Sequence, residues 1–245
     1  MTKREAYLLA GPTASGKSAA AAILARARGA AILSADSMLV YRGMDLGTAK
    51  PSREEREEFC MGGVDIVTPA EHFSSGAWLR AAAEWLAALP ADRPVVVVGG
   101  TGLYFSALLR GLDREWTFPP PEYPVLQMPR ARLHERIESR LDAMFMDGLA
   151  AEVAELRRVY PVWSDTASAA IGYKEFIEGL PVESVREKIL VRTRQLAKRQ
   201  DTWFRHQATP IYVEPTVDAV RACWRERGPW SVRFQAAALE HGGGF

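Results

Sequence analysis

A short segment near the N-terminus has the spacing of a phosphate-binding loop. Residues 11–18 read GPTASGKS, which fits the pattern G-x-x-x-x-G-K-S. In such a loop the glycines let backbone N–H groups approach phosphate oxygens, the lysine adds positive charge, and the serine hydroxyl can bind Mg²⁺. The residues expected to bind phosphate are Gly11, Pro12, Thr13, Ala14, Ser15, Gly16, Lys17 and Ser18, and Ser18 is the expected metal ligand.

Asp36 is the acidic residue that the chain order brings nearest to this loop. Most P-loop NTPases have an acid at the end of a second strand, but VVVV (95–98) leads into GGTGLY (99–104) without one. The carboxyl ends of parallel strands converge on one crevice, and Asp36 ends the run AAILSAD (30–36). Two interpretations stay open: Asp36 caps a turn, or it is a general base beside the loop. The glycines of GGTGLY either form a tight turn or bring Thr101 close to a ligand.

A basic helix is predicted over residues 182–206. Its apolar residues repeat at helical spacing, and two pairs of cations, Arg192 with Arg199 and Lys198 with Arg205, each recur after seven residues. This flank is either a solvated helix face or, with the aromatic residues between the cations, a surface for phosphate contacts and base stacking.

The elements that would position these residues alternate between strand and helix. AYLLAG (6–11) predicts a strand, KSAAAAILARARG (17–29) a helix, and AAILSAD (30–36) and RPVVVVGGTG (93–102) two further buried strands. This order predicts an α/β fold with a parallel sheet flanked by helices.

The second half of the chain is predicted to be mostly helical. Residues 113–129 are rich in proline and lack any period, which indicates a connector rather than an element. The helix that follows carries an apolar stripe and is expected to continue beyond Gly148. We expect one P-loop catalytic domain over residues 1–245, with residues 207–245 as a C-terminal appendage.

Composition bounds the class of protein. The chain has 245 residues, 48% hydrophobic and 25% charged, as in ordinary soluble domains. The net charge of +1 means that any surface for nucleic acid must be local. Cys60 and Cys223 lack zinc or redox spacing, and no apolar run approaches the roughly 18 residues of a membrane span. We therefore expect a cytoplasmic protein without membrane contact.

Several blocks together resemble the tRNA dimethylallyltransferase family. This family transfers a five-carbon prenyl group from dimethylallyl diphosphate to the exocyclic N6 amine of the adenosine just 3′ of the tRNA anticodon. The matching blocks are, in order, GPTASGKS (11–18), SADSMLVYRGMDLGTAKPS (34–52), VGGTGLYFSALLRGL (98–112), RLHERIESRLDAMFMDGLAAEV (132–153), AIGYKEF (170–176) and RTRQLAKRQDTWFR (192–205).

The resemblance implies a P-loop fold like that of nucleoside kinases, in which the loop holds a diphosphate leaving group. Lys17, Asp36 and Thr101 would be catalytic: Lys17 stabilises the diphosphate, Asp36 takes the amine proton, and Thr101 positions the diphosphate or the adenine. Mg²⁺ would be the cofactor, with Ser18 as its ligand. The chain would act as a monomer on the tRNA anticodon stem-loop and dimethylallyl diphosphate.

The resemblance also implies a set of residues that contact tRNA around the extruded base. They are Asp36, Ser37, Met38, Leu39, Thr101, Ala170, Ile171, Gly172, Tyr173, Lys174, Glu175, Lys198, Arg199, Gln200, Trp203 and Arg205.

One departure from the family concerns length. Family members usually carry a helical insertion between the blocks that end at residue 112 and start near residue 130, and it grips the anticodon stem-loop; here only the proline-rich segment stands there. Alternatives to tRNA prenylation are a prenyltransferase that acts on a free adenine nucleotide, an ATP-dependent small-molecule kinase, and a non-catalytic tRNA-binding remnant.

Overall fold

The strands form one sheet around the phosphate loop. The computed structural model describes residues 4–110, 122–207 and 210–232. In chain order the strands are β1 (Arg4–Ala10), β2 (Ala31–Ala35), β3 (Val95–Gly99), β4 (Tyr123–Leu126), β5 (Pro210–Val213) and β6 (Trp230–Val232). The first five run parallel in the order β2-β3-β1-β4-β5, and β6 pairs antiparallel with β1. The predicted α/β fold is confirmed, with the loop at the carboxyl end of a central strand.

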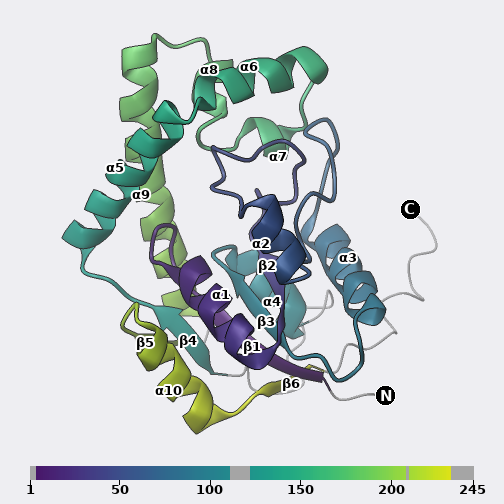
Figure 1. The fold of residues 1–245 in the computed structure, drawn as a ribbon. Coiled ribbons are helices and arrows are strands. Elements are labelled where there is room, and N and C mark those ends of the chain that lie inside the picture. The colour runs from purple at the N-terminus through teal and green to yellow at the C-terminus, as the bar shows by residue number, and fades with distance from the viewer. Residues whose placement is uncertain (1–3, 111–121, 208–209, 233–245) are drawn as a thin grey trace.

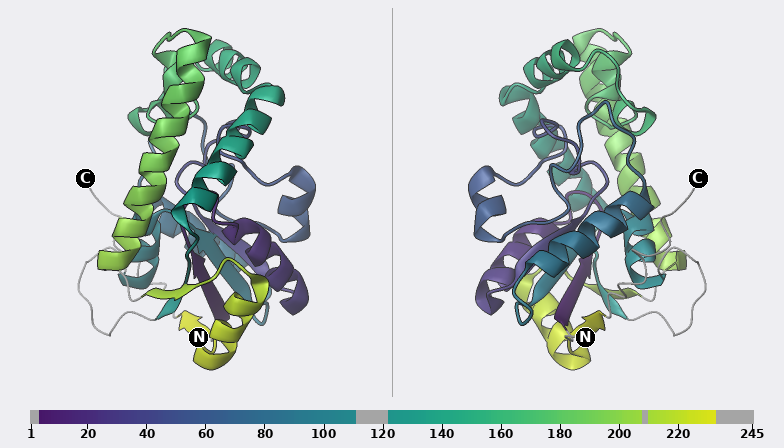
Figure 2. Two further views of the ribbon diagram at one scale, coloured as in Figure 1. Left: turned by 90° about the vertical axis from the view of Figure 1, so that its left-hand side faces the viewer. Right: turned by 90° about the vertical axis from the view of Figure 1, so that its right-hand side faces the viewer.

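Helices cover the sheet and also rise beyond it (Figure 1). They are α1 (Lys17–Arg28), α2 (Arg53–Glu58), α3 (Ser75–Ala88), α4 (Gly102–Arg110), α5 (Arg130–Met146), α6 (Leu149–Val159), α7 (Asp165–Ser168), α8 (Lys174–Ile177), α9 (Val182–Gln207) and α10 (Val217–Arg227). We call α5 to α9 the helical lobe; the side views show it standing away from the sheet (Figure 2). Within the described ranges, no helix is both long and apolar enough to cross a membrane.

Side chains alternate between the two faces of the sheet, and both faces are buried. Tyr7 and Leu9 of β1 pack in a cluster with α1 and α10. Leu8 and Ala10 pack in the other cluster, with α3, α4 and the helical lobe. Because each face meets a helical layer, the strands are apolar at successive positions, as the sequence predicts for a covered parallel sheet.

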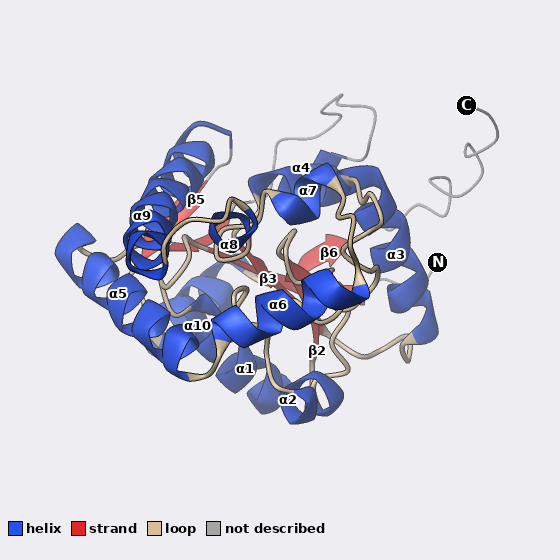
Figure 3. Ribbon diagram, turned by 90° about the horizontal axis from the view of Figure 1, so that it is seen from above, coloured by secondary structure: helices blue, strands red, loops and turns tan. Residues whose placement is uncertain are grey.

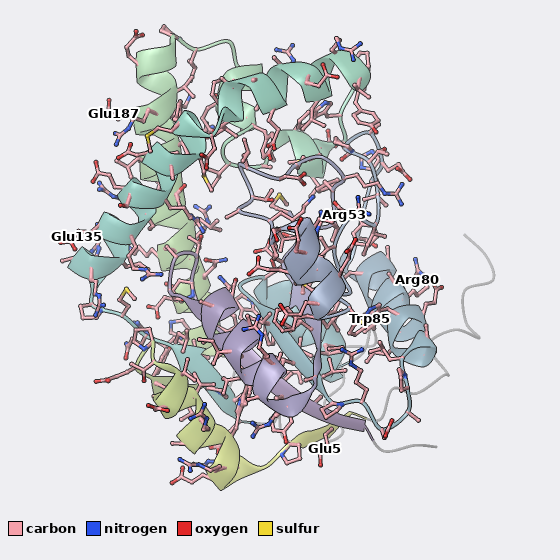
Figure 4. All side chains as sticks on the ribbon, viewed as in Figure 1. Glu5, Arg53, Arg80, Trp85, Glu135 and Glu187 are labelled. Atoms are coloured by element: carbon pink, nitrogen blue, oxygen red, sulfur yellow. The ribbon has the colours of Figure 1, made fainter. Side chains whose placement is uncertain are left out.

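The helical lobe is built on the contact between α5 and α9. Leu133, Ile137 and Leu141 of α5 are buried, which confirms the predicted apolar stripe. Glu135 of α5 and Glu187 of α9 point away from the molecule (Figure 4).

The prediction that the helix continues beyond Gly148 is wrong. Gly148 has φ +98°, a left-handed conformation that glycine adopts without strain, and the helix therefore ends before it. The chain turns there and restarts as α6, which crosses the top of the molecule in the view from above (Figure 3). This turn gives α6 a direction that a continuous helix could not have.

Two further predictions about the second half are corrected. Residues 113–121 of the supposed connector lie outside the described residues, but Tyr123–Leu126 forms the buried strand β4. Of the segment 207–245, treated as an appendage, the described part adds β5 to the sheet, and Trp224 of α10 donates from Nε1 to the Leu8 carbonyl, 3.0 Å away. These elements are short, and neighbouring strands rather than a local sequence period specify them.

Replacing Trp224 with phenylalanine is expected to lower the free energy of unfolding by about 1–3 kcal/mol, because a buried hydrogen bond to Leu8 is lost. The control, Arg225→Ala on the exposed side of the same helix, should change it by less than about 0.5 kcal/mol. Urea denaturation followed by circular dichroism measures both. If both variants are as stable as the wild type, α10 does not support the sheet.

Candidate active site

The phosphate loop joins β1 to α1, and the side chain of Lys17 turns back to bond the loop's own backbone. Gly16 starts the helix with φ +93°, and Ser15 donates its backbone N–H to the Pro12 carbonyl at 3.3 Å. The Nζ atom of Lys17 donates to the same carbonyl at 3.2 Å. Burial lowers the pKa of Lys17 to about 8, although the nearby carboxylate of Asp36 opposes this shift. The loop thus holds a cation whose pKa lies below that of an exposed lysine.

Side chains from the helical lobe bind the loop from the other side. Arg136 donates from Nε to the Ala14 carbonyl at 2.8 Å, and Arg140 donates from Nη2 to Thr13 Oγ1 at 2.6 Å. Burial lowers the pKa of Arg140, and the charge of Asp36 counters it. Neither arginine is among the site residues predicted from the sequence. The signal was present, because residues four apart share one face of a helix.

Gln200 of α9 connects the loop to the neighbouring strand end. Its Oε1 accepts the backbone N–H of Thr13 at 2.8 Å, and its Nε2 donates to the Gly100 carbonyl at 3.0 Å. A Cβ atom at Gly100 would lie 2.5 Å from Nε2, so this position is kept clear for the glutamine. Gln200 is predicted from the sequence to contact tRNA, and in the structure its side-chain amide also orients the phosphate loop.

Asp36 and Thr101 lie together where β2 and β3 end. Asp36 accepts the N–H of Met38 on Oδ1 at 2.9 Å, so the turn-cap interpretation is confirmed. Thr101 donates its backbone N–H to the Ala35 carbonyl at 3.1 Å, and its Oγ1 accepts the N–H of Ser37 at 3.0 Å. The Met38 bond orients the Asp36 carboxylate, which a role as a base would also require.

Two cavities meet at Asp36. The loop cavity, ≈ 290 Å³, is lined by Lys17 and Ser18 together with apolar residues such as Phe59 and Met61. The lobe cavity, ≈ 240 Å³, lies between the strand ends and the helical lobe. Both are lined by Thr13, Asp36, Thr48 and Arg140. Asp36 therefore lines both the space beside the phosphate loop and a second, less polar space.

Most of the residues expected to contact tRNA line these cavities or the outer face of α9. Leu39 lines the loop cavity. Those on the lobe cavity are Asp36, Ser37, Met38, Thr101, Ala170, Ile171, Gly172, Arg199 and Gln200. Lys198, Arg199 and Arg205 are exposed on α9, and Arg205 pairs with Asp201 at 2.6 Å. Lys174 is partly buried, with its Nζ 4.0 Å from Glu178, and Trp203 is partly buried against Gly102.

Two of the expected tRNA contacts are wrong. Tyr173 and Glu175 are both fully buried. The hydroxyl of Tyr173 donates to Glu152, and Glu175 accepts the N–H of Gly172 and pairs with Arg192. Since neither side chain reaches the surface, both act on the protein's own backbone and side chains. Position in a matching sequence block did not reveal which way each side chain points.

Thr48 and its neighbours were missed as site residues. Thr48 lines both cavities, and Gly47 lines the lobe cavity. Both belong to the block YRGMDLGTAKP, to which the sequence reasoning gave no chemical role beyond family resemblance. Only the fold of the loop between β2 and α2 brings them opposite the helical lobe.

Comparisons with known proteins agree with this geometry. Residues 39–126 and 120–207 match the family model described as IPP transferase, and residues 4–59 match the model described as isopentenyl transferase. The tRNA dimethylallyltransferase of Acidithiobacillus ferrooxidans is 33% identical over 286 aligned residues, covering 87% of this chain and 91% of that protein. That of Phenylobacterium zucineum is 34% identical, covering 90% and 95%.

Solved structures show the same fold. The tRNA isopentenylpyrophosphate transferase of Bacillus halodurans superposes with a TM-score of 0.79 at 25% identity, covering 92% of this chain and 97% of that one. The tRNA delta(2)-isopentenylpyrophosphate transferase of Staphylococcus epidermidis gives 0.79 at 26% identity, covering 91% and 99%. The sequence matches, the shared fold and the phosphate loop beside Asp36 lead to one conclusion: this chain belongs to the IPP transferase family.

Proposed function

We propose that this protein transfers the dimethylallyl group of dimethylallyl diphosphate to the N6 amine of the adenosine 3′-adjacent to the tRNA anticodon, releasing diphosphate. Its relatives are named tRNA dimethylallyltransferase. The observation that carries the proposal is the position of Asp36, whose carboxylate lines both the loop cavity and the lobe cavity. Donor and acceptor would meet there, one in each cavity. Family membership disfavours the kinase alternative.

The loop cavity suits an allylic diphosphate. The loop amides, Lys17 and Arg140 would stabilise the negative charge that grows on the diphosphate as the carbon–oxygen bond breaks. Ile32, Phe59 and Met61 supply an apolar wall for a short hydrocarbon group. A polar and an apolar part in one cavity match the two ends of this donor.

Asp36 is the proposed general base. In the transfer step the N6 nitrogen bonds to C1 of the allyl group, the bond from C1 to the diphosphate oxygen breaks, and the N6 proton passes to Asp36. The hydrogen bond from Met38 to Oδ1 holds the carboxylate in place. Thr101, 3.0 Å from the N–H of Ser37, would orient the adenine or the diphosphate from the lobe cavity.

Mg²⁺ is the proposed cofactor, and the donor set fits it. The Ser18 hydroxyl and the Asp36 carboxylate both line the loop cavity, and oxygen ligands of this kind together with substrate phosphates are what Mg²⁺ prefers. Ser18 is the proposed protein ligand. When bound, the cation would supply further positive charge against the leaving diphosphate.

The lobe cavity is the proposed acceptor site. Extruding a base from the anticodon loop costs about a few kcal/mol, which phosphate contacts can offset. Lys198, Arg199 and Arg205 on the exposed face of α9 would supply them. The reaction would take place in the cytoplasm, and the protein would act as a monomer.

The acceptor assignment is tested by product analysis. With Mg²⁺ and dimethylallyl diphosphate, an unmodified anticodon stem-loop is expected to gain a prenyl group, because the exposed cations of α9 contact RNA phosphates. AMP, which lacks those phosphates, is expected to react far more slowly. Mass spectrometry of both products decides the matter. Prenylated AMP without prenylated RNA would contradict the proposal.

Asp36→Asn is expected to lower kcat by about 100-fold or more, because the amide cannot accept the N6 proton. Asparagine keeps an oxygen for the Met38 N–H, so the turn should persist. Single-turnover assays measure the chemical step, and calorimetry should find the affinity for dimethylallyl diphosphate little changed. A kcat close to that of the wild type would remove Asp36 from the role of base.

The pH dependence of kcat/KM for dimethylallyl diphosphate is expected to follow the titration of Lys17. Its pKa of about 8 means that the ammonium is present below that pH and is lost as the pH rises through it. The kcat/KM for dimethylallyl diphosphate should therefore fall above about pH 8 in the wild type. In Lys17→Arg the guanidinium stays charged, and the decline should move to higher pH. An unchanged decline in the arginine variant would assign the titration to another group.

A further inference from the structure

Glu152 of α6 binds a run of backbone amides in the loop between β2 and α2. Its Oε2 accepts the N–H groups of Asp45 and Leu46 at 3.2 and 2.8 Å, and its Oε1 accepts that of Gly47 at 3.4 Å. The hydroxyl of Tyr173 donates to Oε1 at 2.6 Å. One carboxylate from the helical lobe thus serves four donors, three of them consecutive on the backbone.

The backbone that Glu152 holds is part of the lobe cavity. Gly47 and Thr48 line that cavity, and a Cβ atom at Gly47 would lie 2.5 Å from the ring of Tyr173. The Tyr173 hydroxyl also accepts the N–H of Gly47 at 3.2 Å. Burial and the neighbouring Glu152 carboxylate raise the pKa of Tyr173, which keeps its hydroxyl a neutral donor. The ring of Tyr173 therefore limits how closely the loop can approach, and the Glu152 carboxylate holds the loop there by hydrogen bonds.

A second carboxylate, this one buried, holds the adjoining part of the cavity wall. Glu175, fully buried, accepts the N–H of Gly172 at 2.8 Å and pairs with Arg192 of α9 at 2.7 Å. A Cβ atom at Gly172 would lie 3.5 Å from the Cα of Gly47, so the two glycines face each other closely. Both line the lobe cavity. The two backbones therefore adjoin each other in the wall of the cavity, and each is held by a carboxylate.

We propose that Glu152, assisted by Tyr173, is a positioning residue for the acceptor base. It touches no reacting atom; it holds Gly47 and Thr48 at the wall against which the extruded adenine would lie, opposite Asp36. Hydrogen bonds to an ionised group are stronger than those between neutral groups, so this carboxylate binds the backbone N–H groups more strongly than an amide in the same place would. The proposal rests on the assignment of the lobe cavity to the acceptor.

The test compares donor and acceptor kinetics. Glu152→Gln keeps the size of the side chain but removes its charge and one acceptor oxygen. The KM for the anticodon stem-loop is expected to rise about tenfold, while that for dimethylallyl diphosphate stays within about twofold. Tyr173→Phe should raise the stem-loop KM in the same direction by less. Glu155→Gln is the matched control, because Glu155 is exposed on the same helix and pairs only with Arg158 among the described residues.

An activity-independent measurement accompanies the kinetics. Hydrogen exchange at the amides of residues 45–47 should become faster in Glu152→Gln and remain unchanged at residues 11–18. Equal losses for both substrates, or an unchanged stem-loop KM with an active wild type, would overturn the positioning role. If Glu152→Gln fails to fold, Tyr173→Phe decides by the same criteria. If the wild type prenylates no RNA at all, the proposed function itself fails, and the acceptor role of Glu152 fails with it.

Discussion

The bridge that Gln200 makes between two strand ends is the interaction on which the site depends. One side-chain amide accepts from Thr13 in the phosphate loop after β1 and donates to Gly100 after β3. It thereby fixes the long helix α9 relative to the sheet. Because the lobe cavity lies between the strand ends and the helical lobe, its position relative to the phosphate loop follows from this contact and from Arg140, which binds the same threonine.

Charge is distributed unevenly although the chain is almost neutral overall. Lys17, Arg136 and Arg140 gather around the phosphate loop, and Asp36 is the carboxylate that lines both cavities beside them. Such a site is suited to an anion, and two of its cations, Lys17 and Arg140, are partly buried. Burial lowers the pKa of Lys17 to about 8, and an arriving anion would favour the charged form.

In the structure, the basic residues of α9 fall into two groups, one paired with carboxylates inside the lobe and one exposed. Arg192 turns inward to Glu175 and Glu178, and Arg186 pairs with Asp142 of α5 at 2.6 Å. These cations cross-link the lobe through ion pairs. Lys198 and Arg199 remain exposed beside the lobe cavity. A helical charge pattern alone could not separate the two groups, since Arg192, which turns inward, and Arg199, which is exposed, lie seven residues apart on the helix.

Local sequence was sufficient for the phosphate loop, for Asp36 at a strand end and for the buried parallel strands, because glycine spacing and runs of apolar residues act over a few positions. The family followed from the same blocks.

The sequence did not reveal β4, β5 or the turn of the chain at Gly148, since short strands and a helix end depend on their neighbours. Nor did it reveal the partners of Glu152, Tyr173 and Gln200. Gln200 reaches Thr13 across 187 residues and Glu152 reaches Leu46 across 106, and no local pattern specifies which distant backbone group a side chain will meet. Sequence determined which chemistry is present; tertiary packing decided which side chains face the cavities and which hold their walls.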